Sequence, residues 1–181
     1  MGAWVQLCPS CGYCAEEIAV FSEGLRNLLN SDDYKRQLAD EAYPELARKF
    51  CCAGMLSEAD GKNDEAGQFF LNAAWDCDDA DSLELAKGLR SKVADLLLKA
   101  LKSGSRWCEE SGAEQLMIAD CLRRAGRAGE AKELLPQVLQ VATGSNLHKV
   151  VEFELKLLEA GDVNCHTVAE AIPDEPGALG S

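Results

Sequence analysis

Apolar side chains recur every three or four positions over most of the chain, which is the spacing that places them on one face of an α-helix. Short polar turns separate these stretches. The helices that this pattern predicts cover about 15–29, 44–59, 66–74, 82–102, 112–125, 128–142 and 146–160. Pro136 falls inside the sixth of them, where proline removes a backbone donor and clashes with the preceding turn. We therefore expect a kink in that helix, or a helix that begins later.

Composition agrees with the helical pattern. Leu and Ala each occur 25 times, whereas Val, Ile and Thr together occur 14 times. Unbranched or small side chains keep their freedom in a helix, and β-branched side chains favour strands. The sequence therefore predicts an all-α protein, apart from its first dozen residues. Its 181 residues suit one compact domain or one domain with a small appendage.

Two of the turns resemble each other. Gly61 and Gly126 are each followed by Glu-Ala at the fourth and fifth positions, with a predicted helix on either side. Glycine can end one helix in the left-handed conformation, and a small alanine lets the next helix approach closely. The pattern resembles the tetratricopeptide repeat, with Gly54 and Ala119 as the small residue of the first helix in each pair. We expect antiparallel helical hairpins stacked as an α-solenoid; a generic helical bundle is the alternative.

Stacked hairpins of this kind form a concave groove, which usually binds a partner protein or an extended peptide. In the tetratricopeptide pattern the groove is lined by the first helix of each pair. The residues expected on that face are Met55, Glu58, Ala113, Leu116, Asp120, Arg123 and Arg124. With Arg127, the two arginines form the densest basic cluster of the chain, a candidate site for an acidic peptide. Alternatively, these cations only offset a helix dipole.

The charge of the chain argues against several classes of partner. The chain has 31 acidic and 18 basic residues, which gives a net charge of −13. Such a surface repels phosphate, so we expect no binding to nucleic acid or to anionic membranes. The first residues lack the features of a signal peptide, and no apolar run approaches the ~20 residues of a membrane span. We therefore expect a cytoplasmic protein with reduced thiols.

The nine cysteines include one specific motif, Cys8-Pro9-Ser10-Cys11-Gly12. Two thiolates at this spacing can hold one zinc ion from a tight turn, and Cys14 is a candidate third ligand. The fourth ligand would come from Cys51, Cys52, Cys165, His166, a neighbouring chain or water. A redox dithiol uses the same spacing, although it normally precedes a helix in a βαβ unit. Three reduced thiols without a metal are the remaining alternative.

The stretch from Trp4 to Tyr13 and the later Phe70-Leu-Asn-Ala-Ala-Trp75 resemble a bacterial family of uncharacterised proteins, the domain-of-unknown-function 2225 family. This resemblance implies an N-terminal zinc ribbon followed by tetratricopeptide-like helices, with no enzymatic activity. The ribbon's first knuckle has no counterpart before Cys8, which suggests an N-terminally shortened chain. We accordingly divide the chain into a Cys-rich zinc-knuckle-like cap at 1–14, a helical-repeat domain at 15–171 and a flexible tail at 172–181.

The sequence contains no recognisable catalytic motif. Its two histidines, His148 and His166, have no companion that would make a nucleophile–base pair, and no phosphate-binding glycine loop is present. The four aspartates between Asp76 and Asp81 fail the calcium-loop pattern and suit helix capping instead. We therefore expect a non-enzymatic protein that binds a partner protein, with metal or thiol chemistry at Cys8, Cys11 and Cys14 as the alternative.

Overall fold

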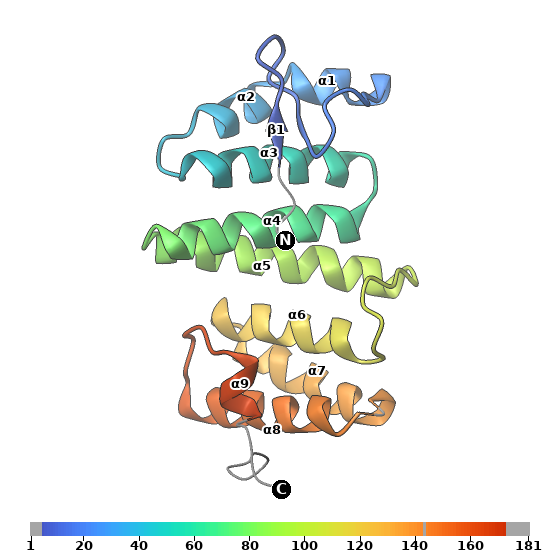
Figure 1. The fold of residues 1–181 in the computed structure, drawn as a ribbon, viewed down its shortest axis with the longest axis vertical. Coiled ribbons are helices and arrows are strands. Elements are labelled where there is room, and N and C mark those ends of the chain that lie inside the picture. The colour runs from blue at the N-terminus through green and yellow to red at the C-terminus, as the bar shows by residue number, and fades with distance from the viewer. Residues whose placement is uncertain (1–4, 143, 173–181) are drawn as a thin grey trace, which may run out of the picture. The chain divides into compact units, whose positions relative to one another are not determined.

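The structure is a computed structural model that describes residues 5–142 and 144–172 (Figure 1). The described chain is mostly helical, which confirms the all-α class. The predicted tail at 172–181 lies outside the described residues except for Ile172. Among the described helices, none has the length and apolar character needed to cross a membrane.

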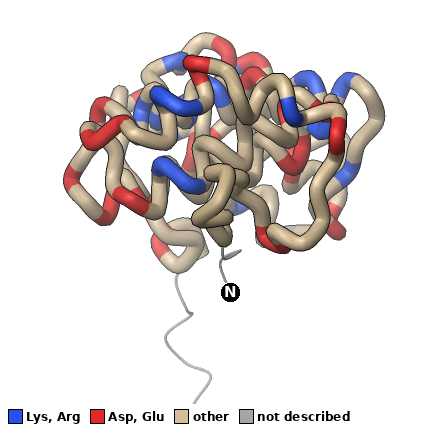
Figure 2. Tube along the Cα trace, turned by 90° about the horizontal axis from the view of Figure 1, so that it is seen from above, with Lys and Arg blue, Asp and Glu red and all other residues tan. Residues whose placement is uncertain are grey.

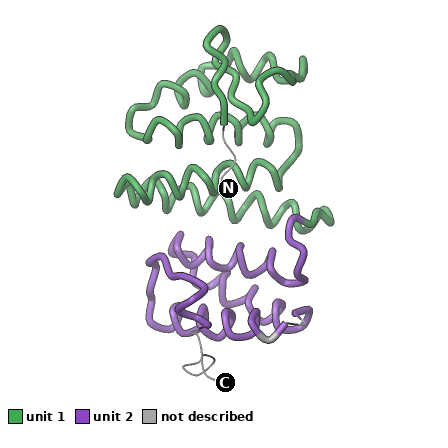
Figure 3. Tube along the Cα trace, in the orientation of Figure 1, with its two compact units in different colours: residues 1–106 green, residues 107–181 purple. Residues whose placement is uncertain are grey.

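The chain divides into two compact units, residues 1–106 and residues 107–181 (Figure 3). Unit 1 contains the strands β1 (Gln6–Leu7) and β2 (Cys14–Ala15), a 3₁₀ turn (Glu23–Leu25) and the helices α1 (Arg26–Leu29), α2 (Asp32–Ala39), α3 (Glu45–Ala59), α4 (Asn63–Asp79) and α5 (Leu83–Lys102). Unit 2 contains α6 (Ala113–Arg124), α7 (Ala128–Val141), α8 (Ser145–Ala160) and α9 (Val168–Ala171).

In unit 1, α3, α4 and α5 lie side by side in chain order, and α2 and β2 pack on α3 (Figure 1). Two glycines allow these helices to approach closely. A Cβ atom on Gly54 would lie 2.8 Å from the ring of Phe70, and one on Gly67 would lie 2.4 Å from Leu97. The small residue predicted at Gly54 therefore does let α4 approach α3 across the first hairpin.

The same closing turn ends four helices. Gly61, Gly126 and Gly161 adopt φ values of +78°, +79° and +68°, and Asp81 adopts +56°. In each case the next amide donates to a carbonyl in the last turn of the helix, as Lys62 does to Ser57 at 2.9 Å. This arrangement satisfies carbonyls that would otherwise lack partners. The predicted helix-ending role of Gly61 and Gly126 is confirmed.

The α3–α4 hairpin is also joined at its open end. The Oδ2 atom of Asp76, in the last turn of α4, accepts a 2.8 Å hydrogen bond from the backbone N–H of Ala47, in the first turn of α3. Two residues on, Asp78 pairs with the buried guanidinium of Arg90 on α5. The acidic run thus connects α4 to both neighbouring helices.

The helix predicted over 15–29 is wrong. Ala15 pairs with Gln6 in a two-stranded antiparallel sheet, and the chain then runs irregularly to the 3₁₀ turn. The aromatic ring of Tyr13 packs edge-on against Phe21 at 5.2 Å, and its hydroxyl donates to the carbonyl of Val20 at 2.9 Å. These tertiary contacts outweigh the helical spacing of the apolar residues. The sixth predicted helix begins at Ala128, so the later start considered because of Pro136 is wrong, and α7 continues through that proline.

In unit 2, α6 and α7 form a hairpin, α8 packs on both, and the short α9 lies on α8. Most of its buried side chains are apolar, among them Ile118, Leu122, Leu135, Val138 and Val151, but Glu114 and Arg123 are almost completely buried as well. Gly112 begins α6 from a φ of +96°, where a Cβ atom would lie 3.1 Å from Val138. The first turn of α6 is therefore held close to the α7 side of the unit.

Candidate functional site

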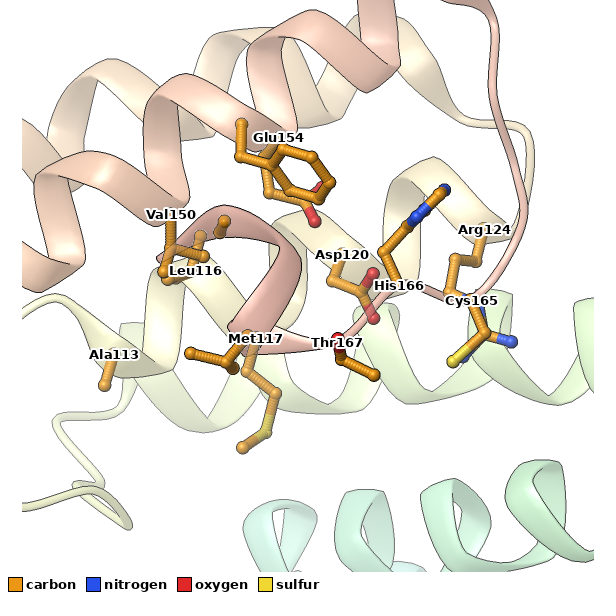
Figure 4. A pocket seen from close by; sticks show the side chains of 13 residues that line it. Ala113, Leu116, Met117, Asp120, Arg124, Val150, Glu154, Cys165, His166 and Thr167 are labelled. Carbon is orange, nitrogen blue, oxygen red and sulfur yellow. The ribbon is translucent and has the colours of Figure 1, made fainter. Parts of the chain in front are cut away.

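A cavity of unit 2, which we call the α6–α8 cleft, occupies about 290 Å³ between α6, α8 and the segment that leads into α9 (Figure 4). Its lining is largely apolar. The residues that contribute are Ala113, Leu116, Met117, Asp120, Arg124, Val150, Phe153, Glu154, Cys165, His166, Thr167, Val168 and Ala171. This volume is at the small end for ligand pockets and suits one or two side chains of a bound segment.

A buried arginine lies beneath one end of the cleft. The guanidinium of Arg123 is 1% exposed and contacts Glu154 at 2.7 Å and Asp120 at 2.7 Å. It also donates to the backbone carbonyls of Asp162 and Asn164, at 2.9 and 3.0 Å. Burial alone would lower the pKa of Arg123, but the hydrogen bond to Glu154 and the two carboxylate charges raise it, so the guanidinium stays charged. Arg123 thereby fastens the segment after α8 to α6.

His166 fastens the same segment from the other side. Its Nδ1 atom lies 2.8 Å from Glu170 and its Nε2 atom 3.0 Å from Asp162, and its ring packs edge-on against Phe153. The hydrogen bond to Glu170, followed by that to Asp162, raises the pKa of His166. The pKa of Glu170 is correspondingly lowered, to about 2. His166, Asp162 and Glu170 therefore form a hydrogen-bonded cluster in the wall of the cleft, which we call the His166 clasp.

The structure brings together four of the residues predicted to lie on the partner-binding face. Leu116, Asp120 and Arg124 lie on one half-buried face of α6 and line the cleft, with Ala113 one turn earlier. The basic cluster predicted with them is not a patch of three exposed cations. Arg123 is enclosed by the network just described, and Arg127 pairs with Glu130 at 2.6 Å. Arg123 and Arg124 lie in the last turn of α6, which is the position that the alternative interpretation, compensation of the helix dipole, requires.

The other two predicted partner-binding residues belong to unit 1. Met55 lines a separate cavity of about 420 Å³, together with Phe70 and Lys92 among others. Glu58 pairs with Lys92 at 2.9 Å, and the Lys92 ammonium lies 4.2 Å from the centre of the Phe70 ring. Glu58 is thus engaged in an ion pair at the edge of this second cavity, and Met55 forms part of its wall.

The cysteine motif forms the tip of the β1–β2 hairpin. Cys8 donates its backbone N–H to Tyr13 at 2.8 Å and accepts from Gly12, whose φ is +78°, at 2.9 Å. The backbone N–H groups of Ser10 and Cys11, and then the Cys11 thiol, hydrogen-bond to the Cys8 sulfur and lower its pKa. The turn therefore places two sulfurs together and supports negative charge on one of them.

Cys14 points away from this tip. It is 1% exposed, against α3, where the thiol of Cys52 hydrogen-bonds to its sulfur and lowers the pKa of Cys14. The same contact, together with burial, raises the pKa of Cys52. Burial raises the pKa of the neighbouring Cys51 to about 12 and that of Cys77 to about 11. Cys14 is thus part of the interior of unit 1.

The positions of Cys8, Cys11 and Cys14 can be compared with the requirements of the predicted zinc site. A structural zinc ion takes four ligands. In the stretches that the structure describes, no three His, Cys, Asp or Glu side chains are grouped so as to hold a metal ion. Cys8 and Cys11 together fit two of the four positions, whereas Cys14 is engaged with Cys52.

Acidic and basic residues are both scattered along the trace (Figure 2). Several basic side chains pair with a carboxylate three or four positions away, as Lys49 does with Glu45 at 2.7 Å. The chain has 31 acidic and 18 basic residues, and the surplus of acidic residues is spread along it. A negative net charge attracts cationic partners and repels anionic ones.

Sequence reasoning missed half of the cleft. Phe153, Glu154 and Val168 come from stretches that carry no recognisable motif. A signal does exist for His166, because Asp162, His166 and Glu170 are spaced by four residues, so that both carboxylates can reach one imidazole. The spacing could have predicted the contacts of His166 with the two carboxylates, but it gives no sign of the cavity beside them.

The chain matches no family model, no curated protein and no solved structure. The resemblance to the domain-of-unknown-function 2225 family therefore stays a prediction, and the candidate sites rest on the residues themselves.

Proposed function

We propose that the chain is a non-enzymatic, cytoplasmic helical-repeat scaffold that binds a segment of a partner protein in the α6–α8 cleft. The observation that carries the proposal is the cleft itself: an apolar cavity beside Leu116 and Met117, with charged groups at its edge. Peptide-binding grooves combine apolar pockets with a few polar groups in this way. The hairpins around Gly61 and Gly126 support a tetratricopeptide-like arrangement of the helices.

The chemistry of the cleft indicates the kind of segment. A volume of about 290 Å³ accepts one or two apolar side chains, and the buried Arg123 is already neutralised by Glu154 and Asp120. An acidic peptide would therefore find the Arg123 guanidinium already compensated. The net charge of −13 favours a cationic partner during encounter. The proposed ligand is therefore a basic segment with an apolar anchor residue.

Two exposed valines provide a matched test. Val168 is 65% exposed and lines the cleft, whereas Val163 is 51% exposed and lies outside the lining. Peptides selected from a random library on the full chain should bind Val168→Asp at least tenfold more weakly, because a carboxylate enters the apolar cavity. Binding to Val163→Asp should stay within twofold of the original affinity. Equal affinities for the two variants would refute the cleft as the binding site.

The second candidate function is metal binding or thiol chemistry at the hairpin tip. The observation that favours it is the pair of sulfurs at Cys8 and Cys11, with backbone N–H groups aimed at Cys8. Such N–H donors stabilise a thiolate, which is the form that binds metal and reacts. In this proposal the remaining zinc ligands come from a neighbouring chain or from water.

Zinc titration against a chromogenic chelator tests this candidate. Cys8→Ser and Cys11→Ser should each abolish stoichiometric binding, while Cys121→Ser, a buried cysteine of α6, should leave it unchanged. Binding that survives both hairpin substitutions would exclude the tip as the metal site. If the original chain binds no zinc, Cys8 and Cys11 are not a zinc site, and thiol chemistry is the role that remains for them.

A further inference from the structure

Unit 1 contains a cysteine pair that neither proposed function uses. Cys14 lies on β2 and Cys52 on α3, and the two residues are 1% and 0% exposed. The Cys52 thiol hydrogen-bonds to the Cys14 sulfur across the seam between the hairpin and the helix. Because β2 packs on α3, the two cysteines come from segments that are far apart in sequence but adjacent in space, as a disulfide requires.

The surroundings hold Cys14 in this orientation. Its backbone N–H donates to the hydroxyl of Tyr34 at 3.2 Å, and that hydroxyl donates to the carbonyl of Gly12 at 2.9 Å. The Cys14 thiol lies 3.6 Å from the same carbonyl. Tyr34, which is itself 1% exposed, therefore ties the end of the hairpin to α2 and keeps Cys14 facing α3.

The two sulfurs differ in how they can be reached. A hollow of about 190 Å³ between the hairpin and α3 includes Cys14 in its lining but not Cys52. Exposed residues such as Glu16, Glu17 and Lys62 also line it, so the hollow opens to the surface. A molecule the size of hydrogen peroxide fits this space, because a water molecule occupies only about 30 Å³. A small oxidant thus meets Cys14 first.

We propose that Cys14 and Cys52 form a peroxide-responsive dithiol, with Cys14 as the attacking and Cys52 as the resolving residue. The Cys14 thiolate attacks one peroxide oxygen, the O–O bond breaks, and the departing hydroxide takes a proton to leave as water. The product is a sulfenic acid on Cys14. The Cys52 sulfur then attacks the Cys14 sulfur, and its proton and the sulfenic hydroxyl leave as a second water. Two thiols and one peroxide give one disulfide and two waters.

The disulfide would fix the hairpin to α3. Peptide mapping of the full chain after treatment with hydrogen peroxide and alkylation tests this. Trypsin places Cys14 in one peptide with Cys8 and Cys11, and both Cys51 and Cys52 in another, so a bond between the segments appears as a linked pair that the single variants assign to its cysteines. The linked pair should persist in Cys51→Ser and disappear in Cys52→Ser and in Cys14→Ser. Peroxide should oxidise Cys14 at least tenfold faster than the buried Cys77 of α4.

A trapping experiment covers the case in which Cys52→Ser fails to fold. Cys52→Ala leaves Cys14 without a resolving partner, so the Cys14 sulfenic acid should persist and be labelled by dimedone. The absence of both the linked pair and the dimedone adduct would overturn the proposal. A link that depends on Cys51, or oxidation confined to Cys8 and Cys11, would overturn it equally.

Discussion

Arg123 and Glu154 form a buried ion pair, 2.7 Å from Nε to the carboxylate, with 1% and 8% of the two side chains exposed. The pair joins α6 to α8, and the remaining guanidinium donors reach Asp120 and the carbonyls of Asp162 and Asn164. The floor of the proposed binding cleft and the segment that walls it are therefore held by one side chain.

Removal of Arg123 should strongly destabilise unit 2. Arg123→Met leaves the buried carboxylate of Glu154 and two carbonyls without their donor, which costs about 3–5 kcal/mol. Urea unfolding followed by circular dichroism measures the loss. As a control, Arg127→Ala removes the pair with Glu130 near the surface and should cost less, about 1 kcal/mol. Similar losses for the two variants would contradict the structural role of Arg123.

The His166 clasp should make the stability of unit 2 depend on pH. The raised pKa of His166 means that its contribution is complete below 6.5 and is lost as the pH rises through the folded value. The lowered pKa of Glu170 means that its contribution is complete above 4.5 and is lost as the pH falls towards about 2. Thermal unfolding should therefore show greatest clasp stability between these limits. His166→Gln should remove the alkaline loss, and His148→Gln should leave it in place.

Close helix approach should make Gly67 intolerant of a side chain. A Cβ atom there would overlap the side chain of Leu97, which is fully buried, so Gly67→Ala forces that side chain to shift and should cost about 1–3 kcal/mol. Gly88 is also inside a helix, but a Cβ atom added there would have no neighbour within 4 Å. Gly88→Ala should therefore stabilise the chain by about 0.5–1 kcal/mol. Chemical denaturation of both variants compares the two effects.

The closing turns offer a paired test of backbone conformation. Gly61 has open space around it, so Gly61→Ala is opposed only by its positive φ and should cost about 1 kcal/mol. Asp81 occupies the equivalent place after α4 with a φ of +56°. Asp81→Gly should relieve strain there and raise the free energy of unfolding. A loss of stability in Asp81→Gly would show that its side chain contributes more than its backbone costs.

Local patterns predicted most of the helices, because their determinants lie within a few residues. The turn at Gly61 follows from one glycine and the periodic residues beside it, and α5 follows from a single apolar stripe. The short α2 had a usable signal that the periodicity did not reveal: Ser31 caps it by accepting from the Tyr34 N–H, and two aspartates follow. The hairpin at Cys14 overrode a helical pattern because the pairing of β2 with β1 and the bond from Cys14 to Tyr34 leave no trace in the spacing of apolar residues.

The candidate sites depend more heavily on distant contacts. The α6 side of the cleft was predictable, since Leu116, Asp120 and Arg124 share a helical face. The partners of Arg123 on α8 and beyond it were not, because no spacing within α6 reveals a carboxylate 31 residues away. For the same reason, the Cys8–Cys11 turn was readable from the sequence, whereas the contact between Cys14 and Cys52 was not.

The hydrogen bond from Ala47 to Asp76 has a consequence for how unit 1 opens. The turn at Gly61 joins the two helices at one end of the hairpin, and this hydrogen bond joins them at the other. Fraying of the first turn of α3 or of the last turn of α4 therefore requires the bond between them to break. The two helices should therefore unfold locally as one cooperative piece, and their amides should exchange hydrogen with a shared free energy. Asp76→Ala would uncouple them, so that the first turn of α3 exchanges well before the rest of the pair.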